Sequence, residues 1–285
     1  MIPPGGGRAP APLAVPAVEP ALPGIHLPPA AATRRPDTPG SSTGPSYAGR
    51  AYTGRSYKDG PCAGGAPIPL AFVVDDAGHN VADAEAYLRF PGKLTLAVLP
   101  QLEFSEEVAR RGMQAGKEVI LHLPMEPQGS SDPGPGAIRV GDAEPAVIGL
   151  LEWHFRSVVT RGVNNHMGSR ATADPRIMDT IMAYLKRTGR FFLDSRTTAD
   201  TVAGEAAARH GVPFLSRDVF LDVNVDEATV VSAIDRGMDI ACAQGSAILI
   251  GHVTNRVVLE VLERRLSEIE HAGFELVHLS ELLPR

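Results

Sequence analysis

The stretch Leu70–Asp76, which reads LAFVVDD, places an apolar run directly before two adjacent carboxylates. A short apolar run with β-branched and aromatic members is typical of a buried strand in a parallel sheet. The carboxyl ends of parallel strands share one edge of the sheet, and active sites of α/β folds lie along that edge. The stretch therefore predicts an α/β fold and marks Asp75 and Asp76 as candidate site residues.

Outward from this stretch, short apolar runs alternate with longer helical patterns along the rest of the chain. The helical patterns include Pro175–Lys186, which Asp174 can cap, and Asn255–His271, which has one apolar face. Strands separated by helices need crossover connections, so we expect a mostly parallel sheet in a (β/α) barrel or a doubly wound fold. The expected strands are Leu70–Val74, Leu94–Leu99, Glu118–Leu123, a short piece around Val163, Phe191–Leu193, Val219–Leu221, Ala247–Ile250 and Glu275–Val277.

Ionisable and amide side chains follow several of these strands. The residues concerned are Asp75, Asp76, His122, Asn164, Asn165, His166, Asp194, Arg196 and His252. Each of these side chains alone has an ordinary structural explanation, such as a helix cap for an aspartate or a core position for a histidine. Because so many of them fall at strand ends of one predicted sheet, we expect them to form a shared site.

The two adjacent aspartates narrow the chemistry of that site. Successive residues of a strand point to opposite faces, so a helix cap explains one carboxylate and leaves the other facing the interior or the rim. A charge there is costly unless a cation accompanies it. An aspartate with two neutral histidines can bind Zn²⁺ or another divalent ion and leave one coordination position for water.

The composition argues against two classes of protein, those that bind nucleic acid through many phosphate contacts and those that span a membrane. The net charge of -6 and the pI of about 5.9 argue against a protein that binds nucleic acid through many phosphate contacts. No apolar run is long enough to span a membrane, and prolines interrupt the Ala9–Ala32 stretch where a secretory leader would lie. Residues 1–66 hold about half of the 25 prolines and few large apolar side chains, so we expect a disordered tail or linker followed by one folded domain at 67–285.

Six segments in order resemble the divergent polysaccharide deacetylase family, a branch of the NodB-like carbohydrate deacetylases. The segments are Val73–Gly78, Leu121–Pro127, Gly162–Ser169, Phe192–Thr198, Arg217–Asp222 and Ala247–His252. The resemblance implies a distorted or incomplete (β/α) barrel of about seven strands. It also implies metal-dependent removal of acetyl groups from N-acetylated glycans and a periplasmic or cell-envelope location.

The resemblance further suggests roles for individual residues. Asp75 would be the catalytic base, and His252 would donate a proton. A divalent metal, most plausibly Zn²⁺, would be held by Asp76, His122 and His166; His166 takes the place of the second histidine that members of the wider group carry shortly after the first. Asp194 would support the site from behind, and the expected substrate contacts are Glu126, Asn164, Asn165 and Arg196.

Two other functions stay open from the sequence. A non-catalytic glycan-binding or regulatory protein could keep the same strand-end residues without turnover. A metal-dependent hydrolase of another bond is the second alternative, although adjacent Asp75 and Asp76 do not supply the separated carboxylates that glycosidases use.

Overall fold

The computed structural model describes residues 66–284, and the expected tail at 1–66 lies outside this part except for its last residue. Nine strands occur in the described part, several of them where the apolar runs predict them. They are β1 (Ile68–Ala77), β2 (Thr95–Val98), β3 (Glu118–Met125), β4 (Gly162–Met167), β5 (Phe191–Asp194), β6 (Phe214–Ser216), β7 (Val219–Phe220), β8 (Ala247–His252) and β9 (Phe274–Val277).

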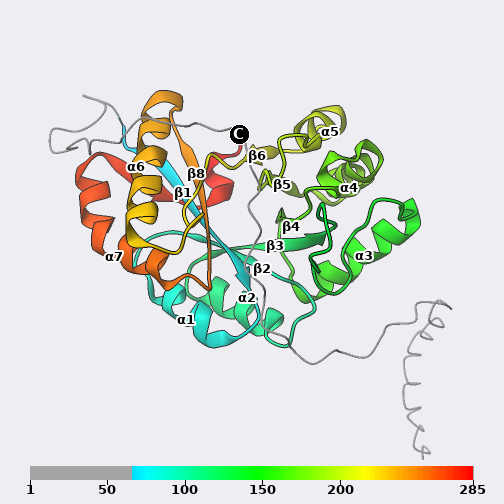
Figure 1. The fold of residues 1–285 in the computed structure, drawn as a ribbon, viewed down its shortest axis with the longest axis horizontal. Helices are drawn as coiled ribbons and strands as arrows, with labels where there is room; N and C mark the ends of the chain where they lie inside the picture. The colour runs from blue at the N-terminus through cyan, green and yellow to red at the C-terminus, as the bar shows by residue number, and fades with distance from the viewer. Residues whose placement is uncertain (1–65, 285) are drawn as a thin grey trace, which may run out of the picture. The chain divides into compact units, whose positions relative to one another are not determined.

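Helices connect most successive strands and lie outside the sheet, as Figure 1 shows. The α-helices are α1 (Val81–Arg89), α2 (Ser105–Gln114), α3 (Glu144–Ser157), α4 (Pro175–Thr188), α5 (Ala203–His210), α6 (Glu227–Gln244) and α7 (Arg256–His271); short 3-10 turns are η2 (Ala171–Ala173) and η3 (Leu279–Leu282). The predicted cap of α4 is present, because the Asp174 side chain accepts a hydrogen bond from the Ile177 amide. None of the described helices is long and apolar enough to cross a membrane.

All strand pairs are parallel, and the sheet runs in the order β6-β5-β4-β3-β2-β1-β8-β7, with β9 added beside β1. No pairing joins the end strands β6 and β7 within residues 66–284. The fold is therefore the incomplete barrel that the family resemblance implies, one of the two folds that the strand and helix pattern left open. It has nine strands where about seven were expected, and the unpredicted β6 is only three residues long.

Two apolar clusters show which face of each strand turns inward. Leu70, Phe72 and Val74 of β1 belong to the larger cluster, which includes buried residues of the surrounding helices. Ala71 and Val73 belong to the smaller cluster, which consists of residues from β1, β2, β3, β5, β8, β9 and η3. Because side chains alternate along a strand, this assigns odd-numbered β1 residues to the barrel interior, and Asp75 continues that row.

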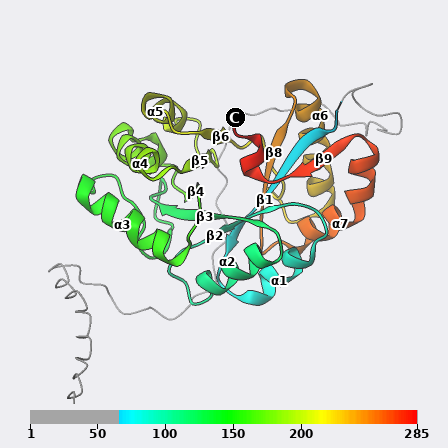
Figure 2. The ribbon, with the colours of Figure 1, turned by 180° about the vertical axis from the view of Figure 1, so that it is seen from behind.

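The C-terminal segment closes the end of the barrel at which the strands begin. Leu279 of η3 is fully buried in the interior cluster, and its amide donates to the Thr95 hydroxyl at the start of β2. Figure 2 shows this segment from behind. The interior therefore stays available for polar side chains only at the other end, where the strands finish.

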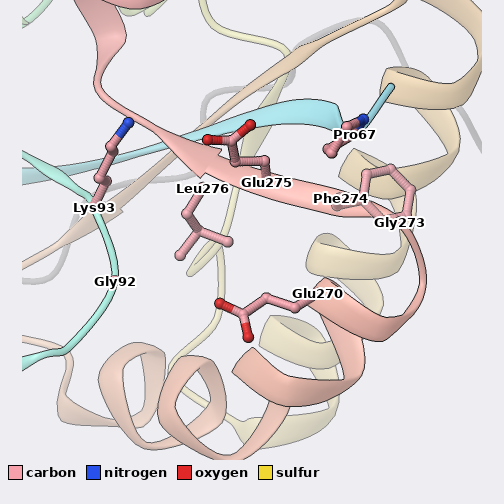
Figure 3. A pocket seen from close by; sticks show the side chains of 8 residues that line it. All are labelled: Pro67, Gly92, Lys93, Glu270, Gly273, Phe274, Glu275 and Leu276. Atoms are coloured by element: carbon pink, nitrogen blue, oxygen red, sulfur yellow. The ribbon is translucent and has the colours of Figure 1, made fainter. Parts of the chain in front are cut away.

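A cavity of about 390 Å³ lies beside the beginnings of β1 and β9. Pro67, Gly92, Lys93, Glu270, Gly273, Phe274, Glu275 and Leu276 line it, as Figure 3 shows. None of the predicted site residues is among them. This cavity is at the opposite end of β1 from Asp75 and Asp76.

Candidate metal and catalytic site

The end of β1 carries both aspartates into the same site. The pairing of β1 with β2 shifts between Val74 and Ala77, and Asp76 has a φ of 64°. Regular alternation would send Asp76 to the helix side, away from Asp75. The irregular backbone instead lets both carboxylates reach one imidazole: His122 Nε2 lies 3.2 Å from Asp76 Oδ1 and 3.6 Å from Asp75 Oδ2.

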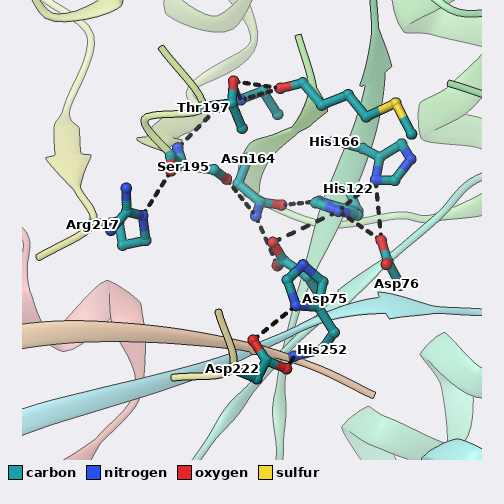
Figure 4. A network of polar contacts seen from close by, with 12 residues as sticks. Asp75, Asp76, His122, Asn164, His166, Ser195, Thr197, Arg217, Asp222 and His252 are labelled. Carbon is teal, nitrogen blue, oxygen red and sulfur yellow. Dashed lines mark hydrogen bonds and ion pairs between the residues drawn. The ribbon is translucent and has the colours of Figure 1, made fainter. Parts of the chain in front are cut away.

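Asp76, His122 and His166 form a compact group of three ligand atoms. Asp76 Oδ1 lies 3.2 Å from His122 Nε2 and 3.0 Å from His166 Nδ1, and the two ring nitrogens are 3.1 Å apart. These side chains come from β1, β3 and β4, whose order in the sheet is β4-β3-β2-β1. The structure thus brings together the three residues that the sequence nominated as metal ligands (Figure 4).

The separations within this group suit a tetrahedral metal ion. Ligands about 2.0–2.1 Å from zinc at tetrahedral angles lie roughly 3.3 Å from one another, close to the three distances here. Asp76 Oδ1 is also a buried oxygen without a hydrogen-bond partner of suitable geometry, although two imidazole nitrogens are near it. A buried carboxylate oxygen in this situation is satisfied by a cation, so the donor set fits Zn²⁺.

Burial and neighbouring charges oppose each other in this group. Burial alone would raise the pKa of Asp76, but the His122 and His166 imidazoles together outweigh it and hold this pKa well below its ordinary value. Burial would lower the pKa of His122, whereas the charges of Asp75 and Asp76 raise it overall. For Asp75, burial dominates and the pKa is raised. The two adjacent carboxyl groups therefore have pKa values shifted in opposite directions.

Asn164 connects Asp75 with His122. It lies on β4 and is fully buried. Its Nδ2 donates to Asp75 Oδ1 at 2.9 Å and to Ser195 Oγ at 3.1 Å, and its Oδ1 lies 2.8 Å from His122 Nδ1. Both amide hydrogens and the oxygen therefore have protein partners, and the side chain lies behind the open part of the site.

His252, at the end of β8, lies beside Asp75 because these residues pair in the β1–β8 register. Its Nδ1 is 3.0 Å from Asp222 Oδ1, and its backbone amide donates to Asp222 Oδ2. Burial by itself would lower the pKa of His252, but the hydrogen bond and charge of Asp222 outweigh it and raise the pKa to about 9. At neutral pH this imidazole is protonated and can act as an acid.

Asp222 was not among the predicted site residues, although the Arg217–Asp222 segment was recognised. Only the short strand β7 (Val219–Phe220) precedes it, so no long apolar run marks its position. Its side chain is nearly fully buried, and both carboxylate oxygens contact His252. The signal that could have found it is a buried acidic residue needed to orient a catalytic histidine.

Glu126, Asn165 and Asp194 make contacts within the protein. Glu126 accepts from the Val140 amide and pairs with Arg170 at 2.8 Å. Asn165 donates to the Met167 carbonyl and accepts from the Ser195 amide. Asp194 accepts from the Arg196 amide and the Thr201 hydroxyl. These contacts hold the strand-end loops together, and the supporting role expected of Asp194 stays a prediction, because its carboxylate bonds the loop residues Arg196 and Thr201.

Arg196 and Arg217 lie at the same end of the sheet. Arg196 is exposed, has a φ of 50° and forms no ion pair within residues 66–284. Arg217 donates to the carbonyls of Ser195 and Arg196, and its guanidinium lies 3.7 Å from the centre of the Phe220 ring. Of the two, Arg196 is the side chain free to meet a ligand.

The fold is that of a carbohydrate deacetylase-like barrel. The sequence profile of the divergent polysaccharide deacetylases matches residues 72–283, and the chain belongs to this family. This confirms the resemblance drawn from the six sequence segments.

Proteins of similar sequence occur in Escherichia coli and Haemophilus influenzae. The chain is 34% identical over 215 residues to the uncharacterized protein YibQ of Escherichia coli K12, covering 75% of this chain and 67% of that one. It is 33% identical over 186 residues to an uncharacterized protein of Haemophilus influenzae, covering 64% of this chain and 66% of the relative. The matched region is thus about two thirds of the length of these relatives.

Solved structures agree with the fold. The uncharacterized protein ATU2773 from Agrobacterium tumefaciens superposes with a TM-score of 0.72 at 25% identity, covering 80% of this chain and 95% of that one. A putative cellobiose-phosphate cleavage protein from Enterococcus faecalis gives a TM-score of 0.55 at 12% identity, covering 77% and 100%. The second likeness shows a shared fold alone.

Proposed function

We propose that this protein is a metal-dependent hydrolase that removes N-acetyl groups from a polysaccharide or cell-envelope glycan. The observation that carries the proposal is the group of three ligand atoms from Asp76, His122 and His166, each 3.0–3.2 Å from the others. Asp75 and His252 stand beside it on paired strands. Membership of a deacetylase family supplies the bond type and the substrate class.

Asp76, His122 and His166 would hold the ion, and one carboxylate with two imidazoles is a donor set that suits Zn²⁺. When bound, the ion would supply Lewis-acid polarisation of a substrate carbonyl and of a water molecule. Asp75 is buried, adjoins Asp76 and receives a hydrogen bond from Asn164, which leaves its Oδ2 facing His122. We assign to Asp75 the acceptance of a proton from the attacking water.

His252 completes the reaction on the leaving-group side. Its Nδ1 is engaged by Asp222, so Nε2 is the atom that can deliver a proton. The water oxygen bonds to the acetyl carbon, and the carbon–nitrogen bond of the acetamide breaks. The water proton goes to Asp75, and the His252 proton goes to the departing nitrogen. The products are a free amino sugar and acetic acid, which keeps the second water proton and then ionises to acetate.

Substrate contacts and location are the less specific parts of the proposal. The exposed Arg196 is available for a hydroxyl or carboxylate of the glycan. Glu126 and Asn165 can contact a glycan only through the hydrogen-bonding positions that their protein partners leave unused. We also propose a cell-envelope location, which is supported by the polysaccharide substrates that the family description names.

Acetate release from N-acetylated chito-oligosaccharides and peptidoglycan fragments tests this function. Zinc-loaded protein should release acetate, and chelator-treated protein should not. Asp75→Asn should retain zinc and lose at least about 100-fold in turnover, since it removes the proton acceptor. Zinc and sugar binding without acetate release would overturn the hydrolase in favour of a glycan-binding protein. Release of a different product would identify another hydrolase.

A further inference from the structure

Asn164 is the buried side chain that contacts both the proposed base and a proposed metal ligand. We propose that Asn164 is a positioning residue that holds the Asp75 carboxylate and fixes the ring tautomer of His122 through one amide group. This inference rests on the proposed function and extends it. It replaces the expected substrate contact of Asn164, because that side chain is fully buried.

The chemistry of the neighbours sets the orientation of the amide. An ionised carboxylate only accepts hydrogen bonds, so the amide nitrogen must face Asp75. That nitrogen also reaches Ser195 Oγ at 3.1 Å, which uses its second hydrogen. The amide oxygen is then left to face His122 Nδ1 at 2.8 Å.

This orientation determines where His122 carries its proton. The Asn164 oxygen only accepts, so His122 must donate from Nδ1. In the neutral ring, Nε2 then has a free lone pair, and Nε2 is the atom 3.2 Å from Asp76 Oδ1 and 3.1 Å from His166 Nδ1. A metal-ligating histidine commonly has its other nitrogen held by such an acceptor.

Ser195 and its own contacts keep Asn164 in place (Figure 4). The Ser195 amide donates to Asn165 Oδ1, and its carbonyl accepts from Arg217 Nε at 2.8 Å. The strand end that contacts Asn164 is thus fixed from two sides. These contacts give Asn165 and Arg217 a part in the site without requiring either to touch the substrate.

A purely structural role would not need this amide. The same inward row of β4 and its neighbours carries Ile120 and Leu193, which fill the interior without hydrogen bonds. A buried amide whose three bonding positions are all matched adds little net stability over an apolar side chain. The amide instead positions two functional groups at once, the Asp75 carboxylate and the His122 ring.

Two substitutions separate the donor and acceptor ends of Asn164. Asn164→Ala removes both contacts, and we expect zinc affinity to fall 10- to 100-fold, the usual loss when a partner behind a metal ligand is removed. Asn164→Asp keeps an oxygen for His122 but loses the donor to Asp75. It should bind zinc within about threefold of wild type and still lose at least tenfold in turnover.

The experiment measures zinc Kd by chelator competition on the full chain and records the His122 Nδ1 proton by ¹⁵N-resolved NMR of zinc-loaded protein. Wild type and Asn164→Asp should show a slowly exchanging Nδ1 proton, and Asn164→Ala should lose it. Thr95→Ala is the matched control: Thr95 is fully buried with two side-chain hydrogen bonds at the opposite end of the barrel. It should lower stability and leave zinc Kd unchanged.

Several results would overturn the inference: wild-type zinc Kd in Asn164→Ala, equal zinc losses in the Ala and Asp variants, a zinc loss in Thr95→Ala, or normal turnover in Asn164→Asp. Zinc Kd and the ring proton do not depend on acetate release. If zinc Kd values and ring-proton signals follow the expectation while no acetate is released, that result would contradict the proposed activity. It would still support the role of Asn164 in positioning His122 for zinc.

Discussion

At the scale of single residues, strand alternation decides which polar side chains reach the site. Ala71 and Val73 face the interior, and Asp75 follows them in the same row of β1. The same two-residue period, continued from Ile250, places His252 inward. The sequence therefore contains enough information to predict these positions. It also contains the reason that Asn165 makes loop contacts, since it is out of phase with Asn164.

Asp76 is the residue whose position alternation does not predict. It reaches His122 and His166 because its φ is 64° and the β1–β2 register shifts beside it. A left-handed conformation at a single aspartate leaves no distinctive pattern in a sequence. The identity of this ligand could be anticipated from the adjacent carboxylates, whereas the backbone that directs it could not.

Replacing Asp76 should separate its metal contact from its backbone conformation. Asp76→Gly and Asp76→Ala should both lose stoichiometric zinc. In the metal-free state the glycine variant should be more stable than the alanine variant by about 1 kcal/mol, because glycine adopts positive φ without a Cβ clash. Urea unfolding in the presence of chelator measures this difference. Greater stability of the alanine variant would contradict the strain explanation.

His252 gives a pH dependence with a definite sign. Its pKa of about 9 lies above the ordinary 6.5, so the stabilising contribution of its pair with Asp222 is complete below about pH 6.5 and is lost as pH rises through 9. The ability of His252 to donate a proton is likewise lost as pH rises through 9, because the imidazole is then neutral. We expect kcat to fall on the alkaline side near pH 9.

Asp222→Asn should move this alkaline fall down by roughly one to two pH units, since it removes the charge that favours the imidazolium. The pH profile of acetate release measures the shift. Asp218→Asn is the control, because Asp218 accepts a hydrogen bond from the Ile248 amide, whereas His252 pairs with Asp222. An unchanged profile in Asp222→Asn would contradict the assigned partner.

At the scale of elements, predictability follows the length of the apolar run. β1, β3 and β8 have long buried runs and were anticipated, although all three extend beyond the predicted ranges. β6 has three partly buried residues and was not anticipated, whereas the two-residue β7 lies within the expected strand Val219–Leu221. Asp222 directly follows that expected strand, so its position at a strand end was available from the sequence, but its contact with His252 was not.

Two glycines in helices should respond oppositely to alanine. In α6, a Cβ at Gly237 would collide with the Leu249 side chain of β8, so Gly237→Ala should destabilise the fold by about 1–3 kcal/mol. In α3, a Cβ added at Gly149 would meet no atom of another element within 4 Å, and Gly149→Ala should stabilise by roughly 0.5–1 kcal/mol through helix propensity. Chemical denaturation of both variants provides the comparison, and a stabilised Gly237→Ala would show that α6 can move away from β8.

At the scale of the whole folded part, the proposed metal would link three separate strands. Its ligands come from β1, β3 and β4, so an ion binds the folded chain and finds no preformed site in the unfolded one. Zinc at 100 times its Kd should stabilise by about 2.7 kcal/mol, which for a domain of this size raises Tm by roughly 5–10 °C.

Thermal unfolding with added zinc or chelator checks this linkage. The rise in Tm should disappear in Asp76→Ala and His122→Ala. Arg209→Ala, which removes an exposed pair with Asp179 on the outer helices, should keep it. An equal rise in all of these proteins would place the zinc elsewhere.

Two different strands pair with successive parts of β1. β9 pairs with residues Ile68–Ala71, and β2 pairs farther along between Val73 and Ala77. Of the strands in residues 66–284, β1 is therefore synthesised first and β9, the partner for its opening half, is synthesised last. A nascent chain that ends before Phe274 has exposed amide and carbonyl groups along that half, and Leu279 is not yet present to fill the interior. The domain can reach its native state only after nearly all of its residues have left the ribosome.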